Sequence, residues 1–382
     1  MNLIKVSPLF LLLLFVHFGN AQSNISKINN NNSLKRNIDS IMHKYAAEYL
    51  TNPSRVGLSL GIYHNKSTST FHYGSTEKKQ TVIPSNKTVY EIGSISKTFT
   101  GTLLAQAVKD KKVKIDDDIR LYLDGSYPNL EYQGHPIRLS HLVSHISGLP
   151  NFLPDDPDLF QKTSPDSLPF VLSRTLNNYS KKRFLDDLHK VKIDTIPGYK
   201  FRYSNSSPLI LKYILEKVYQ NNFDEILQKF IYKDLKMKNT TSVFNKINLN
   251  HLAKGYNSKG NLMPYIPENL DAAGGLFSTI PDMLKYLKFH LNENNEVIAL
   301  SHKATMGDIK NYAIGLNWQE VITTKGHKKI WQSGGTFGFS SYCVLYPDLD
   351  FAIILLTNEA DNTAQTELGQ IADKLFDYIN KH

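Results

Sequence analysis

The chain has almost no cysteine: its 382 residues include one, Cys343. A single cysteine excludes any disulfide bond within the chain. Cys343 lies in an apolar run with the pattern of a strand, where a buried and inert thiol is the usual outcome. The fold must therefore be stabilised by a packed core, and an apolar content of 41% is sufficient to form one.

Long apolar runs are also absent, since no stretch reaches the roughly 20 residues needed to cross a membrane as a helix. Residues 9–16 form a short apolar run that follows Lys5 and precedes Gly19-Asn20-Ala21. A positive charge, a short apolar core and small residues in this order are typical of an export signal cleaved after Ala21. We therefore expect residues 1–21 to be a signal peptide, with no integral membrane segment in the mature chain and a periplasmic or extracellular location.

The excess of positive charge, +9 at pH 7, is not gathered into a basic block interleaved with aromatic residues. No nucleic-acid-binding motif is present either, so we expect no nucleic-acid partner. The histidines include His141 and His145, whose spacing of four could place two metal ligands on one helix face. No His-Glu-x-x-His motif accompanies them, and we expect neither a metal nor another cofactor.

Both ends of the chain show the patterns of a sheet with covering helices. Residues 22–33 are polar, and we expect them to be a disordered lead-in. Apolar residues then recur at helical spacing from Leu34 to Tyr49, and residues 56–63 and 69–73 read as two strands. A final amphipathic helix is predicted at the other end. Four strands are predicted before it, over residues 315–321, 329–333, 339–346 and 351–357.

The middle third, about residues 115–290, mixes helical patterns with long loops. The simplest assembly joins both chain ends in one antiparallel β-sheet flanked by helices, an α+β arrangement within the broad α/β class. The middle third is then inserted as a mostly helical lobe. We therefore expect one folded domain over residues 34–380, with a functional site in the cleft between its two lobes.

Ser94-Ile95-Ser96-Lys97 stands where an apolar run turns into a helix. Residues three apart are neighbours on one helical turn, so this spacing places a hydroxyl beside an amine. Such a pair can form an activated serine nucleophile without a histidine. Gly93 precedes Ser94, and the unpaired N–H groups at a helix N-terminus suit a developing oxyanion.

Two other serine patterns lack the context that their chemistry needs. Ser75-Thr76-Glu77-Lys78 repeats the spacing in a polar turn with no following helix. Gly57-Leu58-Ser59-Leu60-Gly61 matches a nucleophile elbow, which requires a strand, a sharp turn and a helix, but here a second strand follows. We expect neither Ser75 nor Ser59 to be catalytic.

Two further segments could complete a site around Ser94. Tyr203-Ser204-Asn205 precedes an apolar helix pattern, where a phenol and an amide could face Ser94 across the cleft. The alternative is that Ser204 or Asn205 only caps that helix. Gln332-Ser333-Gly334-Gly335 lies between two predicted strands, and its glycines could admit a substrate to a strand edge or simply form a hairpin bulge or turn.

In this order, the segments Gly93–Gly101, Tyr203–Ser207 and Gln332–Gly335 resemble the three motifs of the penicillin-recognising serine hydrolases. The most similar branch contains the class C β-lactamases, the DD-peptidases and the β-lactamase-like esterases. Leu142–Pro150 and Ala272–Thr279 resemble supporting segments of the same family. The resemblance covers roughly residues 35–380, and it implies a β-lactamase/transpeptidase-like fold that agrees with the organisation above.

The resemblance implies a role for each motif residue. Ser94 would attack a carbonyl and become acylated, and Lys97 would accept or relay its proton. Tyr203 would share that proton transfer and later help to activate water, so either Lys97 or Tyr203 could be the base. Asn205 would orient Lys97 and the substrate amide. The backbone N–H groups of Ser94 and Gly335 would form the oxyanion hole, with Gln332, Ser333 and Gly334 beside the substrate.

Gln332 departs from the family pattern, because the third motif usually opens with Lys or His. A cation there attracts a substrate carboxylate, and glutamine adds no charge. We therefore expect an exported serine hydrolase that acts on an amide or ester such as a peptidoglycan D-Ala peptide or a β-lactam. One alternative is an esterase or D-aminopeptidase for substrates without a carboxylate. The alternative from another class is a non-catalytic penicillin-binding sensor, which would normally need a membrane link.

Overall fold

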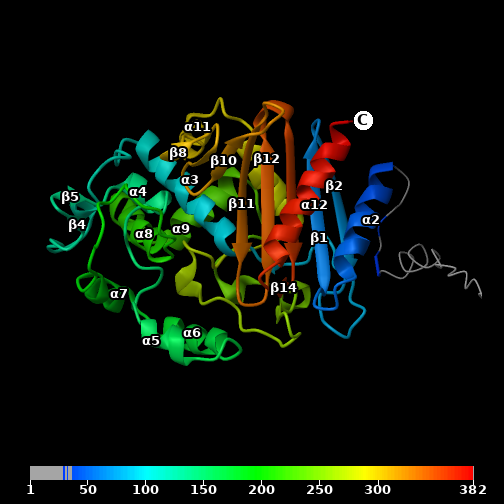
Figure 1. Ribbon diagram of the computed structural model, residues 1–382, viewed down its shortest axis with the longest axis horizontal. Coiled ribbons are helices and arrows are strands. Elements are labelled where there is room, and N and C mark those ends of the chain that lie inside the picture. The colour runs from blue at the N-terminus through cyan, green and yellow to red at the C-terminus, as the bar shows by residue number, and fades with distance from the viewer. Residues whose placement is uncertain (1–28, 31, 33–36, 382) are drawn as a thin grey trace, which may run out of the picture.

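A computed structural model describes residues 29, 30, 32 and 37–381 (Figure 1). The expected signal peptide, residues 1–21, lies outside the described residues. Among the helices that are described, none combines the length and the apolar character required to span a bilayer. Cys343 is fully buried, and burial raises the pKa of its thiol to about 12, as expected for an inert cysteine.

Eight antiparallel strands form the main sheet, and the two ends of the chain supply all of them (Figure 1). Pairing of β1 with β13 joins the two ends of the chain in one sheet, which confirms the expected fold class. In spatial order the strands are β2 (Ser67–Gly74), β1 (Gly57–His64), β13 (Phe351–Thr357), β12 (Ser340–Tyr346), β11 (Lys328–Gly335), β10 (Gln319–Ile322), β9 (Tyr312–Ile314) and β8 (Met306–Asp308).

Helices cover both faces of this sheet, because its central strands are apolar along their whole length. Every residue of β12 and β13 is buried. On one face, α2 (Asn37–Leu50) and α12 (Ala364–Ile379) share an apolar core with these strands. On the other face, a second core contains α3 (Ser96–Lys109), which follows the single turn η2 (Gly93–Ile95), and α10 (Ile280–His290).

The remaining helices lie mainly beside one end of the sheet (Figure 1). They are η3 (Ile119–Tyr122), α4 (Leu139–Val143), α5 (Pro157–Lys162), α6 (Leu168–Asn177), α7 (Lys181–Leu188), α8 (Ser206–Tyr219), α9 (Phe223–Gln228), the π-helical η4 (Lys229–Asp234), η5 (Phe244–Lys246), η6 (Leu249–His251), η7 (Glu268–Leu270), α11 (Glu296–Ser301) and η8 (Pro347–Leu349). Three short strand pairs lie outside the main sheet: β3 (Tyr90–Glu91) with β7 (Phe277–Ser278), β6 (Tyr256–Asn257) with β14 (Glu359–Ala360), and a local hairpin of β4 (Glu131–Tyr132) with β5 (His135–Pro136).

Helix α10 falls within the expected helical lobe, residues 115–290, but it packs on the sheet against β1 and β13. The reason is steric: Gly61 in β1 has no side chain, and Ile280 and Leu284 of α10 fill the space above it. Helix α3 lies at the junction, in contact with both α8 and α11. The lobe that borders the cleft therefore ends before α10.

Of the lead-in expected to be disordered, residues 22–33, only residues 29, 30 and 32 are described, and Asn30 and Asn32 contact β2. Asn30 forms a β-bridge with Tyr73, and the Asn32 side chain exchanges hydrogen bonds with the His72 backbone. An edge strand such as β2 offers unpaired backbone groups, and these residues pair with them.

The apolar pattern over residues 315–321 does not form the single strand that we expected. Instead, Gly315 donates its N–H to the Trp318 carbonyl and closes a loop between β9 and β10. Leu316 and Trp318 are fully buried in this loop, which explains the strand-like pattern. Gly334 and Gly335 do not form the hairpin turn or bulge that was the alternative, because both residues belong to β11.

The turn η2 packs directly on β11, and two glycines make this possible. Gly93 has a φ of 52°, in the left-handed region that favours glycine. A Cβ on Gly334 would overlap the Ile92 carbonyl oxygen, and a Cβ on Gly93 would lie 2.7 Å from the Gly335 nitrogen. The close approach of turn and strand places Ser94 beside the end of β11.

We expect Gly334→Ala to lower the free energy of unfolding by about 1–3 kcal/mol, because the added methyl group meets backbone atoms that cannot rotate away. Urea unfolding of purified protein measures this change. Gly335→Ala is the matched control, since its Cβ meets only the flexible end of the Gln365 side chain. Equal stability of the two variants would show that the turn does not need this close contact.

Candidate active site

Ser94 and Lys97 are brought together as their spacing predicts. Ser94 lies in η2 and Lys97 in the first turn of α3, and the Lys97 Nζ is 3.0 Å from the Ser94 Oγ. Lys97 is fully buried although it carries an amine. Its Nζ also donates to the Asn205 Oδ1 at 2.7 Å and to the Ala273 carbonyl oxygen. Three acceptors therefore match the three hydrogens of an ammonium group.

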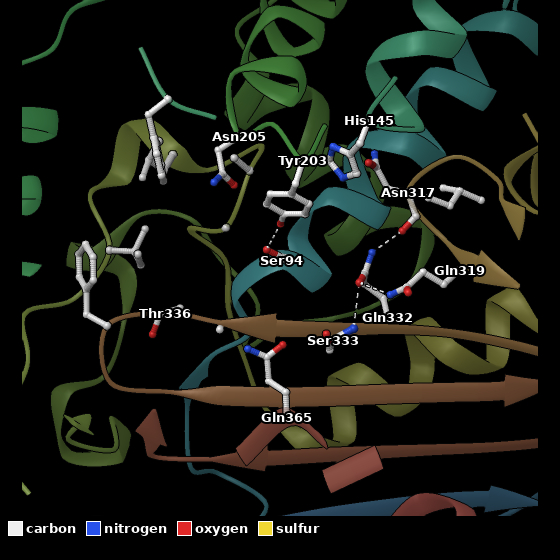
Figure 2. A pocket seen from close by; sticks show the side chains of 18 of the residues that line it. Ser94, His145, Tyr203, Asn205, Asn317, Gln319, Gln332, Ser333, Thr336 and Gln365 are labelled. Atoms are coloured by element: carbon white, nitrogen blue, oxygen red, sulfur yellow. Dashed lines mark hydrogen bonds between the residues drawn. The ribbon is translucent and has the colours of Figure 1, made fainter. Parts of the chain in front are cut away.

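Tyr203 reaches Ser94 from the helical lobe (Figure 2). Its phenol oxygen is 2.6 Å from the Ser94 Oγ, and its side chain remains 37% exposed at the cleft. The ring packs against His145 with centroids 4.4 Å apart, and the Lys97 Nζ lies 5.0 Å from its centroid. The phenol is therefore held between the nucleophile and a buried imidazole.

His145 supports Tyr203 as a neutral ring. Burial, with a smaller contribution from the Lys97 charge, lowers the pKa of His145 to about 3. The Ser204 N–H donates to the His145 Nδ1 at 3.3 Å, which leaves the ring proton on Nε2. His141 does not share a helix face with His145, because α4 ends before His145, whose φ is 58°. Within residues 37–381, no cluster of side chains suited to a metal ion is found.

Asn205 is fixed by Asn151, a residue that the sequence analysis did not identify. The Asn205 Nδ2 donates to the Asn151 Oδ1 at 2.8 Å, and the Asn151 carbonyl oxygen accepts the Asn205 N–H. With its amide nitrogen held in this way, Asn205 points its oxygen at Lys97. Asn151 directly follows the supporting segment that ends at Pro150, which is the one sequence signal that could have indicated it.

The end of β11 offers a free N–H beside Ser94. Gly335 pairs in register with Ser340, and the next residue, Thr336, donates its N–H to the Phe339 carbonyl. Because hydrogen bonding alternates along an antiparallel pair, the Gly335 N–H points away from β12. On that side, β10 pairs only with residues 328–331, so Gly335 faces the cavity.

Gln332 lines the cavity, but its side chain is already engaged (Figure 2). The Gln332 Nε2 donates to the Asn317 carbonyl oxygen at 2.6 Å, while its Oε1 accepts hydrogen bonds from Gln319 and from the Ser333 N–H. Asn317 in turn donates its Nδ2 to the Lys97 carbonyl oxygen. The position where a cation was expected in related chains is therefore closed by a network of amides.

A cavity of about 560 Å³ opens over Ser94, a size typical of a small-molecule site. Ser333 and Gly335 line it, whereas Gly334 lies beneath η2. The lining residues include no Lys, Arg, Asp or Glu among those that the structure describes, and its histidine, His145, is neutral. The cavity is therefore uncharged at its surface.

The two rejected serine patterns lie apart from this cavity. Ser59 is fully buried in β1, where its hydroxyl contacts the His72 Nδ1 and the Tyr90 phenol. Ser75 bonds to carbonyl oxygens of its own turn. Neither hydroxyl lines the cavity over Ser94.

Glu91, on β3 behind the cavity wall, is a buried carboxyl group that the sequence analysis did not identify. Its Oε1 accepts the Ile266 N–H at 2.6 Å, and its Oε2 has no hydrogen-bond partner within the part of the chain that is described. Burial raises the pKa of Glu91 to about 7, although the Thr336 hydroxyl and the Ile266 N–H partly offset this. Ile266 and Thr336 both line the cavity.

Because the pKa of Glu91 is higher in the folded state than its ordinary 4.5, its stabilising effect is complete below about pH 4.5 and is lost as the pH rises through about 7. Glu91→Gln keeps an acceptor for Ile266 but removes the titration. Between pH 5 and pH 8 the wild type should lose up to about 3 kcal/mol of unfolding free energy more than this variant. Urea unfolding across that range, with the exposed Glu296→Gln as control, tests this; equal pH dependence of wild type and Glu91→Gln contradicts it.

A family model described as Beta-lactamase matches residues 36–376. Protein flp of Staphylococcus aureus (strain MRSA252) is 27% identical over 308 residues, covering 78% of this chain and 57% of that protein. The chain thus spans little more than half the length of this relative. A β-lactamase of Providencia stuartii is 25% identical over 344 residues, which cover 79% of this chain and 82% of that protein.

Solved structures show the same fold. A β-lactamase/D-alanine carboxypeptidase from Yersinia pestis, complexed with citrate, superposes with a TM-score of 0.73 at 22% identity, covering 89% of this chain and 97% of that one. A class C β-lactamase from Rhodobacter sphaeroides gives a TM-score of 0.71 at 20% identity, covering 89% and 99%. The octameric penicillin-binding protein homologue from Pyrococcus abyssi gives 0.71 at 21% identity, covering 85% and 74%.

Proposed function

Because the chain belongs to the β-lactamase family, we propose that it is a serine hydrolase that forms an acyl-enzyme on Ser94 and cleaves an amide or ester bond. One observation carries this proposal: the Ser94 Oγ lies 2.6 Å from the Tyr203 phenol oxygen and 3.0 Å from the Lys97 Nζ. A serine hydroxyl held by two groups that can move its proton has the arrangement of an activated nucleophile.

In acylation, Tyr203 acts as a phenolate: the Ser94 Oγ attacks the carbonyl carbon, and the Ser94 proton moves to the Tyr203 oxygen. Lys97 already directs three hydrogens at Ser94, Asn205 and the Ala273 carbonyl, so it acts as a positive charge that stabilises the phenolate. The tetrahedral intermediate then collapses, the bond to the leaving group breaks, and Tyr203 returns the proton to that group. This arrangement favours Tyr203 over Lys97 as the base.

The developing oxyanion is placed between the backbone N–H groups of Ser94 and Gly335. The close packing of η2 on β11 brings these two groups together without a side chain between them. Loss of one such donor typically costs about 10²–10³ in rate. In deacylation, water attacks the acyl carbon while Tyr203 takes a proton from it; the bond between that carbon and the Ser94 Oγ then breaks, and Tyr203 returns the proton to Ser94.

The lining of the cavity favours a substrate without a carboxylate over a D-Ala peptide or a β-lactam. No cation among the described lining residues is available to pair with an anion, and the Gln332 donor is occupied by the Asn317 carbonyl. We therefore place a neutral ester or amide first. A non-catalytic penicillin-binding sensor is the weaker alternative, because it too would have to bind the carboxylate of a penicillin in this uncharged lining.

We further propose that the enzyme is exported to the periplasm or the exterior, on the strength of the signal-like residues 1–21. Such a location would give the enzyme access to envelope components and to small molecules that enter from outside. The mature chain would then begin at Gln22.

Ser94→Ala should abolish both turnover and the covalent intermediate, because it removes the hydroxyl that Tyr203 and Lys97 hold. The test is intact-mass measurement after brief mixing with p-nitrophenyl acetate and, separately, with a penicillin. Wild type and the exposed-serine control Ser258→Ala should gain one acyl group from the ester. Normal ester turnover by a folded Ser94→Ala variant would show that Ser94 is not the nucleophile.

Gln332→Lys should raise kcat/KM for carboxylate-bearing substrates about tenfold or more, since a charge-assisted hydrogen bond contributes more than a neutral one. Gln365→Lys adds the same charge elsewhere in the cavity and serves as the control. A penicillin and a D-Ala-terminated peptide, each compared with its neutral methyl ester, provide the measurement. If Gln332→Lys changes kcat/KM equally for the acid and for its methyl ester, the missing charge at this position does not determine substrate specificity.

A further inference from the structure

One side of the cavity over Ser94 is apolar. Leu172 and Leu176 reach it from α6, Ile266 and Leu270 from the segment at η7, and Phe152 from a neighbouring loop, whereas Phe201 packs against His145 with ring centroids 5.9 Å apart. None of the first five side chains has a polar group to offer. These five side chains line the same cavity as the nucleophile, and α6 contacts η7, so we call this group the apolar arm.

The apolar arm is built by a helical hairpin, α5 and α6, that is tied to the segment opposite. The Asn269 Nδ2 donates to the Leu176 and Tyr179 carbonyl oxygens, and the Lys259 Nζ pairs with Asp166 at 2.6 Å. Leu172 and Leu176 are the buried residues of these two helices, and both line the cavity, while Leu176 also belongs to the adjoining core. The hairpin therefore contributes to the cavity wall.

The other side of the cavity is polar. Asn317, Gln319 and Gln332 gather there, next to His145 and on the same side of Ser94 in Figure 2. Tyr203 lies between Ser94 and His145, so a leaving group on this polar side is within reach of the phenol that protonates it. The acyl part of a substrate then extends in the other direction, along the apolar arm.

We propose that the apolar arm binds the acyl chain of the substrate, so that the preferred substrate is a neutral ester or amide of a medium-length, unbranched fatty acid. This inference rests on the proposed function, and it adds the chemical class of the acyl group. The chain remains in the arm after acylation, when the Ser94 Oγ–carbon bond has formed and the alcohol or amine has left with its proton. A charged acyl group, such as that of an amino acid, would lose its hydration in the arm without gaining a hydrogen-bond partner.

The length of the acyl chain provides the test, because each buried methylene strengthens apolar binding by up to about fourfold. Wild-type kcat/KM for p-nitrophenyl esters should rise about two- to fourfold per added methylene from acetate to octanoate. Acetate esters of alcohols of the same lengths should show no such rise. A flat acyl series, or a rise with the alcohol instead, overturns the inference.

Leu172→Asn should lower the octanoate-to-acetate ratio of kcat/KM about tenfold or more, since it places an amide in the arm. Phe170→Asn is the matched control: it lies on the same helix, is 47% exposed and does not line the cavity, so the ratio should stay at the wild-type value. An unchanged ratio in folded Leu172→Asn contradicts the inference. If that variant does not fold, the wild-type series decides.

The two proposals fail in different ways. Ser94-dependent turnover of p-nitrophenyl acetate with no preference for acyl length would leave the serine hydrolase in place and remove the acyl-chain assignment. Absence of any Ser94-dependent turnover or adduct, at every chain length, would remove the proposed function itself.

Discussion

The buried amine of Lys97 makes the interactions on which the site depends. A polar group without water is costly unless hydrogen bonds replace its hydration. The replacements are the Ser94 hydroxyl, the Asn205 amide and the Ala273 carbonyl, from three distant segments of the chain. Each segment must be held in place for Lys97 to keep these hydrogen bonds. The stability of the fold and the geometry of the nucleophile are therefore tied to the same three contacts.

Much of the fold could be predicted because its strongest signals are local. Strands β12 and β13 are buried on both faces and therefore read as apolar runs, whereas α12 is buried on one face and reads as an apolar stripe. The sequence predicts all three elements to within a few residues. The errors have physical causes. Leu316 and Trp318 are buried in a loop and imitate a strand, while Asn30 pairs with an edge strand that the polar sequence around it does not reveal.

The site residues that could be predicted are those that lie close together in the sequence or belong to a recognisable motif. Ser94 and Lys97 follow from helical spacing, whereas Tyr203 is placed beside them only by the tertiary fold, and its role rested on resemblance. The hold of Asn151 on Asn205 could not be read from the sequence, because it depends on the angle at which a loop meets α8. For the same reason, sequence indicated that Gln332 lacks a charge, but not that its amide is already engaged.

The uncharged lining of the cavity has a consequence for how substrate arrives. A cleft lined with charge of one sign focuses its field and accelerates the capture of oppositely charged molecules, and this advantage fades as salt is added. No charged side chain is among the described lining residues, and the amine of Lys97 lies beneath Ser94 without reaching the cavity surface. Encounter with a neutral molecule then depends on diffusion and on the release of water from apolar walls. Capture of substrate would accordingly proceed at nearly the same rate in dilute and in saline surroundings.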